Sequence, residues 1–168
     1  MKAVILTLLS CFILSLSACE KLPDPLVPDP PQEGKNEGGD HSEETDTAMP
    51  ETIKITVSGK TLPVKIEDNE ATKALVAALN EASLTYEAHD YGGFEKVGAL
   101  GRTLPSSDTR ITTQAGDVIL YSGNQIVLFY GSNTWSYTRI GQMQYGSLDE
   151  LKSFLKAGEG NISVTLSL

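Results

Sequence analysis

Hydrophobic and polar residues alternate in several short segments after residue 51, and this period of two predicts β-strands. Residues 52–57 and 62–66 alternate in this way and are joined by Ser58-Gly59-Lys60, so they predict a hairpin. Residues 83–88 and 162–168 show the same alternation. Because successive side chains of a strand point to opposite faces, each of these strands is expected to bury one face.

The most apolar part of the domain predicts a central hairpin. Residues 118–121 and 126–130 are almost wholly hydrophobic and are separated by Ser122-Gly123-Asn124. Two such runs around a short glycine turn indicate strands that are buried on both faces. Residues 135–140 alternate again and predict a further strand, whereas residues 94–104 show no clear period.

Two segments show helical spacing instead. Apolar residues from Ala71 to Leu79 fall on one face of a helix, with Asp68 or Asn69 before them as the cap. Ser147-Leu148-Asp149-Glu150 fits a capping box, which predicts a second helix that ends at Gly158 or Gly160. Many short strands with about two short helices predict a mainly β fold, organised as a closed or nearly closed β-barrel.

The first residues of the chain have the pattern of a signal peptide, predicted over residues 1–18. Met1-Lys2 supplies a positive charge, and residues 3–16 are almost all apolar but short for a membrane span. Leu16-Ser17-Ala18-Cys19 resembles a bacterial lipobox. The resemblance implies cleavage before Cys19, diacylglycerol on its thiol, and a further acyl chain such as palmitate on its amino group. A buried apolar helix with a chance cysteine is the alternative.

Lipidation of Cys19 would place the protein at a lipid bilayer, because two or three acyl chains on one residue give stable attachment. The expected location is therefore the bacterial cell envelope, with the outer membrane favoured and the leaflet left open. The two cysteines of the chain are Cys11 and Cys19. Neither lies beyond residue 19, so no disulfide is expected in the folded part.

An acidic segment rich in proline and glycine, residues 19–50, predicts a tether ahead of one domain over residues 51–168. The tether cannot bury enough apolar surface to offset its ordering entropy. The domain itself holds 13 acidic and 10 basic residues, a net charge of −3 against −9 for the whole chain. It carries no stripe of lysine and arginine, so we expect no binding to nucleic acid.

Three blocks of the domain, residues 116–121, 126–130 and 137–141, are similar to the signature of small bacterial cyclophilin-like domains. Residues 69–75 and the Leu104-Pro105 step also fit that pattern. The resemblance covers nearly all of residues 52–168 and implies a cyclophilin-type β-barrel with the helices near its ends. It does not imply prolyl isomerase activity.

Cyclophilins that isomerise proline place an arginine over an apolar and aromatic bed, within a Phe-x-x-x-His-Arg stretch. This chain lacks that stretch, and its arginines, Arg102, Arg110 and Arg139, stand in other contexts. The resemblance therefore supplies a fold more than a function.

Aromatic residues near the end of the central hairpin are the strongest candidates for a binding site. Tyrosine and tryptophan beside loops, together with an arginine, are typical of recognition surfaces. By their period of two, Trp135, Tyr137 and Arg139 are expected to share one face. Core packing of the aromatic residues, with a cation–π contact for the arginine, is the alternative. The candidate ligand-binding residues are Tyr130, Asn133, Trp135, Tyr137 and Arg139.

Other chemistry has little support in the sequence. His41 and His89 have no second ligand at metal-binding spacing, so neither a metal site nor a cofactor is expected. His89-Asp90 is interpreted as a solvated loop pair. The leading hypothesis is a monomeric, membrane-anchored envelope lipoprotein that binds a peptide or small ligand without catalysis. A divergent peptidyl-prolyl isomerase is the alternative, and a purely structural envelope role stays open.

Overall fold

A computed structural model describes residues 48–168 of the protein. The predicted signal peptide, Cys19 and nearly all of the predicted tether lie outside the described residues. The elements, in chain order, are β1 (Thr52–Val57), β2 (Lys60–Ile66), α1 (Glu70–Glu81), β3 (Leu84–Tyr91), β4 (Glu95–Ala99), β5 (Thr109–Thr112), β6 (Asp117–Tyr121), β7 (Gln125–Phe129), β8 (Thr134–Met143), α2 (Leu148–Phe154) and β9 (Ile162–Ser167). Within this part of the chain, no helix has the length and apolar character needed to span a membrane.

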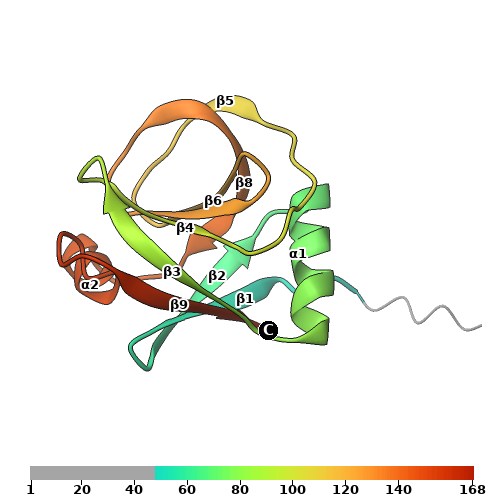
Figure 1. Cartoon of the computed structure of the whole chain (residues 1–168), viewed down its shortest axis with the longest axis horizontal. Coiled ribbons are helices and arrows are strands. Elements are labelled where there is room, and N and C mark those ends of the chain that lie inside the picture. The colour runs from blue at the N-terminus through green and yellow to red at the C-terminus, as the bar shows by residue number, and fades with distance from the viewer. Residues whose placement is uncertain (1–47) are drawn as a thin grey trace, which may run out of the picture. The chain divides into compact units, whose positions relative to one another are not determined.

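Eight of the strands close into an antiparallel barrel (Figure 1). Their order is β2-β1-β9-β3-β4-β7-β6-β8, and β8 then pairs with β2 to complete the circle. This closing contact joins Val64 to Met143 and Ile66 to Gly141. The predicted fold, a mainly β closed barrel with two short helices, is confirmed.

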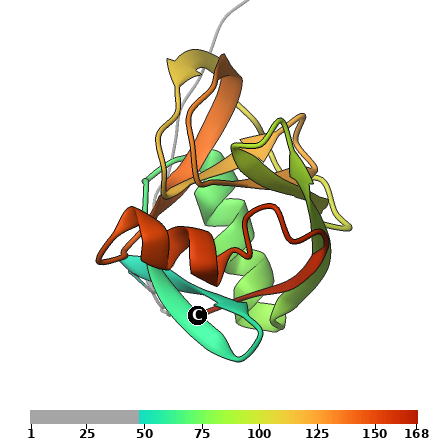
Figure 2. The same cartoon turned by 90° about the vertical axis from the view of Figure 1, so that its left-hand side faces the viewer.

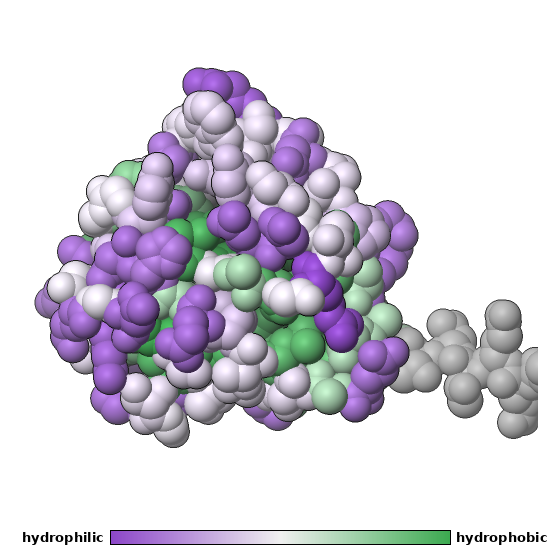
Figure 3. Space-filling view, in the orientation of Figure 1, coloured by the Kyte–Doolittle hydropathy of each residue, from purple (hydrophilic) through white to green (hydrophobic). Residues whose placement is uncertain are grey.

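The barrel interior holds the main hydrophobic core. Apolar side chains such as Ile53, Leu120 and Leu166 are fully buried there. The two helices lie on opposite sides of the barrel (Figures 1 and 2). Leu75 of α1 and Leu151 of α2 are buried in the same core, so each helix packs its apolar face onto the barrel. Polar residues cover most of the face drawn in Figure 3, with hydrophobic residues visible between them.

A second, smaller apolar cluster lies on the outer face of the sheet formed by β4, β7, β6 and β8. It comprises Val97, Ile119, Val127, Phe129 and Tyr137. Because β6 and β7 bury alternate residues in the two clusters, both of their faces are covered, as the sequence predicted for this hairpin.

The two halves of the long strand β8 pair with different strands. Its second half pairs with β6 in the barrel, while its first half, Thr134–Tyr137, pairs with β5. A register shift opposite Val118 and Ile119 marks a bulge in β8, and bulges bend the strand that carries them. The first half of β8 and β5 consequently rise away from the barrel as a two-stranded ribbon (Figures 1 and 2).

Several boundaries differ from the sequence predictions. The strand β3 continues to Tyr91, three residues beyond the predicted end, and β4 occupies the segment that showed no period. The second helix ends at Phe154 rather than at a later glycine. Its capping serine accepts a hydrogen bond from the Glu150 N–H, but the Glu150 carboxylate accepts from Gly146 N and not from the serine's own N–H.

Candidate functional site

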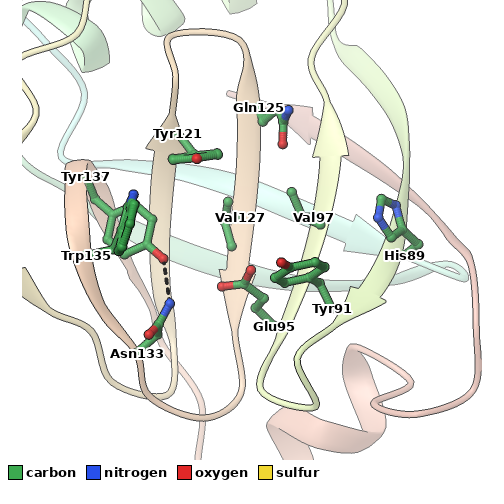
Figure 4. A pocket seen from close by; sticks show the side chains of 10 residues that line it. All are labelled: His89, Tyr91, Glu95, Val97, Tyr121, Gln125, Val127, Asn133, Trp135 and Tyr137. Carbon is green, nitrogen blue, oxygen red and sulfur yellow. Dashed lines mark hydrogen bonds between the residues drawn. The ribbon is translucent and has the colours of Figure 1, made fainter.

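A pocket of about 500 Å³ opens on the outer face of the barrel, beside the second apolar cluster (Figure 4). Its floor comes from β4 and β7, and its walls come from β3, β6 and the first half of β8. Ten residues line it: His89, Tyr91, Glu95, Val97, Tyr121, Gln125, Val127, Asn133, Trp135 and Tyr137.

The lining is made of residues two apart on neighbouring strands. His89 and Tyr91 lie on β3, opposite Val97 and Glu95 of β4 respectively. Val97 in turn lies opposite Val127 of β7. Since residues two apart on a strand face the same side, this register gathers the side chains on one surface.

Aromatic rings shape one wall of the pocket. Tyr137 makes edge contacts with Tyr121 and with Phe129, at ring-centre distances of 5.9 and 5.8 Å. The amide of Asn133 donates a hydrogen bond of 3.0 Å to the Tyr137 hydroxyl, which fixes that ring (Figure 4). At the rim, by contrast, Tyr91 is 61% exposed and Trp135 is 53% exposed. Two large aromatic side chains thus remain open to a ligand.

One carboxylate lies among these rings. Glu95 is only 6% exposed, and its Oε2 is buried and accepts no hydrogen bond from the described residues. In Figure 4 its carboxylate lies between the Tyr91 ring and the Asn133–Tyr137 pair. Burial disfavours the ionised form and raises the pKa of Glu95 to about 7. The group can therefore change its charge near neutral pH.

The next residue of β4, Lys96, is also buried, but it has a charged partner. Lys96 is fully buried on the other side of the strand, and its Nζ lies 2.8 Å from Asp90 Oδ2. Asp90 also accepts hydrogen bonds from the Tyr130 hydroxyl and from the N–H groups of Gly158 and Gly160. Burial acts to raise the pKa of Asp90, but the bonds from Lys96, the two backbone N–H groups and Tyr130 outweigh it and lower the pKa to about 2.

His89 and Asp90 therefore do not form a solvated loop pair. Both belong to β3, and they point to opposite faces of it, as adjacent strand residues do. His89 lines the pocket, whereas Asp90 holds Lys96 and the segment around Gly158 and Gly160. The interpretation as a loop was wrong because β3 extends to Tyr91.

Arg139 lies outside the pocket. Its Nη1 lies 2.7 Å from Oδ1 of Asp117, a fully buried carboxylate, and its Nε lies 3.5 Å from Glu67. Burial raises the pKa of Asp117, although the bond from Gln114 N and the charge of Arg139 act against the rise. The arginine thus has a structural partner within the fold.

The structure brings together three of the five predicted ligand-binding residues: Asn133, Trp135 and Tyr137 line the pocket. Tyr130 is buried in the main core, where its hydroxyl bonds Asp90, and Arg139 pairs with Asp117. Sequence reasoning did not select Tyr91 or Glu95. Glu95 and Val97 are two residues apart, so a prediction of residues 95–99 as a strand would have placed both side chains on one face.

Among residues 48–168, no three His, Cys, Asp or Glu side chains come together as metal ligands would. The pocket offers one carboxylate and one imidazole, from Glu95 and His89. Its polar groups suit hydrogen bonding and charge recognition more than metal coordination.

Comparisons with known proteins agree with the barrel. The model of the cyclophilin-like family matches residues 55–167, and the chain belongs to this family. Its fold is similar to that of a hypothetical protein from Archaeoglobus fulgidus, solved in solution, with 16% identity and a TM-score of 0.50 over 73% of this chain and 98% of that one. No curated protein matches the sequence. The comparisons establish a fold and a family, and leave the function to be inferred from the pocket.

Proposed function

We propose that the cyclophilin-like domain is a noncatalytic binding module, held at the bacterial envelope by lipidated Cys19, that takes a peptide or small ligand into the pocket of Figure 4. The single observation that carries the binding proposal is the rim, where Tyr91 and Trp135 stand exposed over a hollow of about 500 Å³. Ligand sites are concave and largely apolar, with a few polar groups that fix orientation.

The same pocket argues for binding over proline isomerisation. The described lining holds no arginine, and Arg139 is occupied by Asp117. The arginine over an aromatic bed that cyclophilins use is therefore not reproduced at this site. The alternative of a divergent isomerase is tested by following the cis–trans exchange of a proline tetrapeptide at high protein concentration, where a rate above the uncatalysed one would support it.

Ligand binding is tested with acetylated, amidated dipeptides in which alanine is followed by Ala, Pro, Phe, Lys or Glu. Trp135 is the single tryptophan of the chain, so its fluorescence reports occupancy of the pocket. We expect saturable binding of at least one dipeptide other than the Ala-Ala blank by the full-length protein in a non-ionic detergent.

The matched variants are Tyr91→Ala, at the rim, and Leu148→Ala, an exposed apolar residue on α2 outside the pocket. We expect Tyr91→Ala to weaken binding about fivefold or more, because a stacked ring contributes about 1 kcal/mol. Leu148→Ala should bind like the parent. Equal affinities in Tyr91→Ala and the parent, or no saturable binding of any dipeptide, would count against the pocket.

The anchor is tested separately in a bacterial host. Cys19→Ser should lose metabolic labelling by palmitate, whereas Cys11→Ser, which changes the other cysteine, should keep it. Palmitate labelling of Cys19→Ser at the level of the parent would exclude the lipid anchor at Cys19 and leave the binding proposal intact.

A further inference from the structure

Glu95 is the buried charged group of the domain that the fold leaves without a partner. Glu95 lines the pocket, and its buried Oε2 receives no hydrogen bond from residues 48–168. No lysine or arginine of these residues lies within ion-pair distance of the carboxylate. The adjacent Lys96 points to the other face of β4 and is held by Asp90. A buried carboxylate normally has a cation or several donors around it.

The surroundings of this carboxylate are those of a cation site. Tyr91 lies directly opposite Glu95 in the strand register, and Tyr137 approaches from β8. Aromatic ring faces carry negative potential and attract ammonium and guanidinium groups. A carboxylate and ring faces therefore favour the same kind of ligand, and no lysine or arginine of the lining opposes it.

The charge pattern disfavours the other ligand classes. An anion would face the Glu95 carboxylate with only His89 to offset it, and the domain has a net negative charge. A wholly apolar ligand would leave Oε2 desolvated and unpaired, which costs free energy. A ligand with a cationic group would offset the charge of the Glu95 carboxylate on binding.

We propose that the pocket binds an organic cation, with its ammonium or guanidinium group seated between Glu95 and the rings of Tyr91, Trp135 and Tyr137. This inference rests on the proposed binding function and names the chemistry of the ligand. The cation can belong to a free small amine or to a basic side chain of a peptide, and the probes below separate these sources.

The binding should depend on pH because Glu95 must be ionised. Burial raises its pKa to about 7, so affinity for a cation rises as the pH increases from about 6 to 8.5. The other titratable side chains that line the pocket are Tyr91 and His89 from β3, Tyr137 from β8 and Tyr121 from β6. Burial, the hydrogen bond and charge of Asp90, and the charge of Glu95 raise the pKa of Tyr130, which lies in the main core. The variant His89→Gln, which removes the imidazole that shares the pocket with Glu95, is the control for the pH profile.

The experiment compares cations with neutral molecules of the same shape, using the full-length protein in non-ionic detergent at pH 8.5. One pair is choline and 3,3-dimethylbutan-1-ol. The other is acetyl-lysine methylamide and acetyl-norleucine methylamide. Trp135 fluorescence gives the dissociation constants, with ligand-detected NMR as the second readout. We expect the cation of at least one pair to bind about tenfold tighter than its neutral partner.

Glu95→Gln separates the specific site from general attraction to an acidic chain. The preference of the variant for the cation over its neutral partner should fall to less than threefold. The difference between parent and variant should persist at 0.5 M NaCl, because a buried charge is screened less than surface charges. Preference for choline alone indicates a small amine, and preference for the lysine derivative alone indicates a basic side chain.

Two outcomes would overturn the inference, and they are distinguishable from failure of the proposed function. Equal binding of cations and neutral partners, or an undiminished preference in Glu95→Gln, would exclude the cation site while the pocket still binds ligands. Absence of binding by all four probes and by the dipeptides would exclude the binding function itself.

Discussion

Replacing Glu95 by glutamine should remove a pH-dependent loss of stability from the domain. In the folded protein burial raises the pKa of Glu95 from 4.5 to about 7, so the folded state binds more protons than the unfolded chain between these values. Stability therefore falls as the pH increases through this interval, and the loss is complete above it. Each pKa unit corresponds to about 1.4 kcal/mol, which gives a total of about 3 kcal/mol.

Glutamine has nearly the same shape but no charge, so the variant lacks this dependence. Its amide carries its own cost of burial, but that cost does not change with pH. The quantity to measure is therefore the difference in unfolding free energy between Glu95→Gln and the parent at pH 4.5, 6, 7 and 8.5. We expect this difference to rise in favour of the variant by about 3 kcal/mol over the range.

Urea unfolding of the two full-length proteins, followed by circular dichroism and by Trp135 fluorescence, gives these free energies. The control is Glu87→Gln, which changes an exposed carboxylate on the neighbouring strand β3, and the pH dependence of the Glu95→Gln difference is compared with that of this control. A difference for Glu95→Gln that does not change with pH would show that Glu95 is solvated or paired in solution, and the reasoning on its burial would fail.

Three further substitutions test the packing behind the pocket, each by urea unfolding. Asp90→Asn leaves Lys96 buried without its counter-charge and should cost about 2 kcal/mol at pH 6. Because the pKa of Asp90 is lowered, the stabilisation by its carboxylate is present above about pH 4 and is lost towards pH 2. The free energies of unfolding of variant and parent should therefore converge near pH 2, and a difference that stays constant with pH would contradict this. Gly98→Ala should disturb the packing of β3 against β4 and lower the free energy of unfolding by about 3 kcal/mol or more, because a Cβ at this position would clash with the Glu87 carbonyl oxygen. A loss below about 1 kcal/mol would contradict that close approach. Tyr86→Phe removes a buried hydroxyl that has no hydrogen-bond partner among residues 48–168, and it should leave stability unchanged or raise it by about 1 kcal/mol. A clear loss of stability would reveal a partner for that hydroxyl.

The predictable strands were those whose residues follow a hydropathy pattern, either alternation or a continuous apolar run. Period two located β1, β2 and β9, and the two apolar runs located β6 and β7. The strand β4 was missed because residues 95–98 are all buried, on both faces, and two of them are charged. A hydropathy pattern does not identify a strand whose buried positions include Glu95 and Lys96, because charged residues are expected at exposed positions.

The site was only partly predictable for a related reason. Trp135 and Tyr137 share a pocket with Asn133, as their place in the sequence indicated, but the opposite wall comes from β3 and the floor from β4 and β7. The order in which β3, β4, β7, β6 and β8 pair is a long-range property of the barrel. Arg139 could not be placed because its partner Asp117 lies 22 residues away and is fully buried.

Glu95 and Lys96 are neighbouring buried charges of one strand, of which Lys96 is paired within the fold and Glu95 is not paired with any of residues 48–168. Their side chains leave β4 on opposite faces, and both are nearly inaccessible to solvent. Lys96 has a carboxylate and a backbone carbonyl as partners, so its burial is compensated within the fold. Glu95 has no such compensation from residues 48–168.

An uncompensated charge in a pocket is costly to stability, and proteins commonly keep such costs where a ligand supplies the missing interaction. The stability and binding measurements on Glu95→Gln therefore test independently whether the Glu95 carboxylate is part of a cation site. If a cation completes the site, Glu95→Gln should have two effects. It should stabilise the ligand-free domain at alkaline pH, and it should abolish the preference for choline over its neutral isostere or for the lysine derivative over the norleucine derivative. A variant that gained stability and kept the discrimination would show that the cation is recognised by the rings alone.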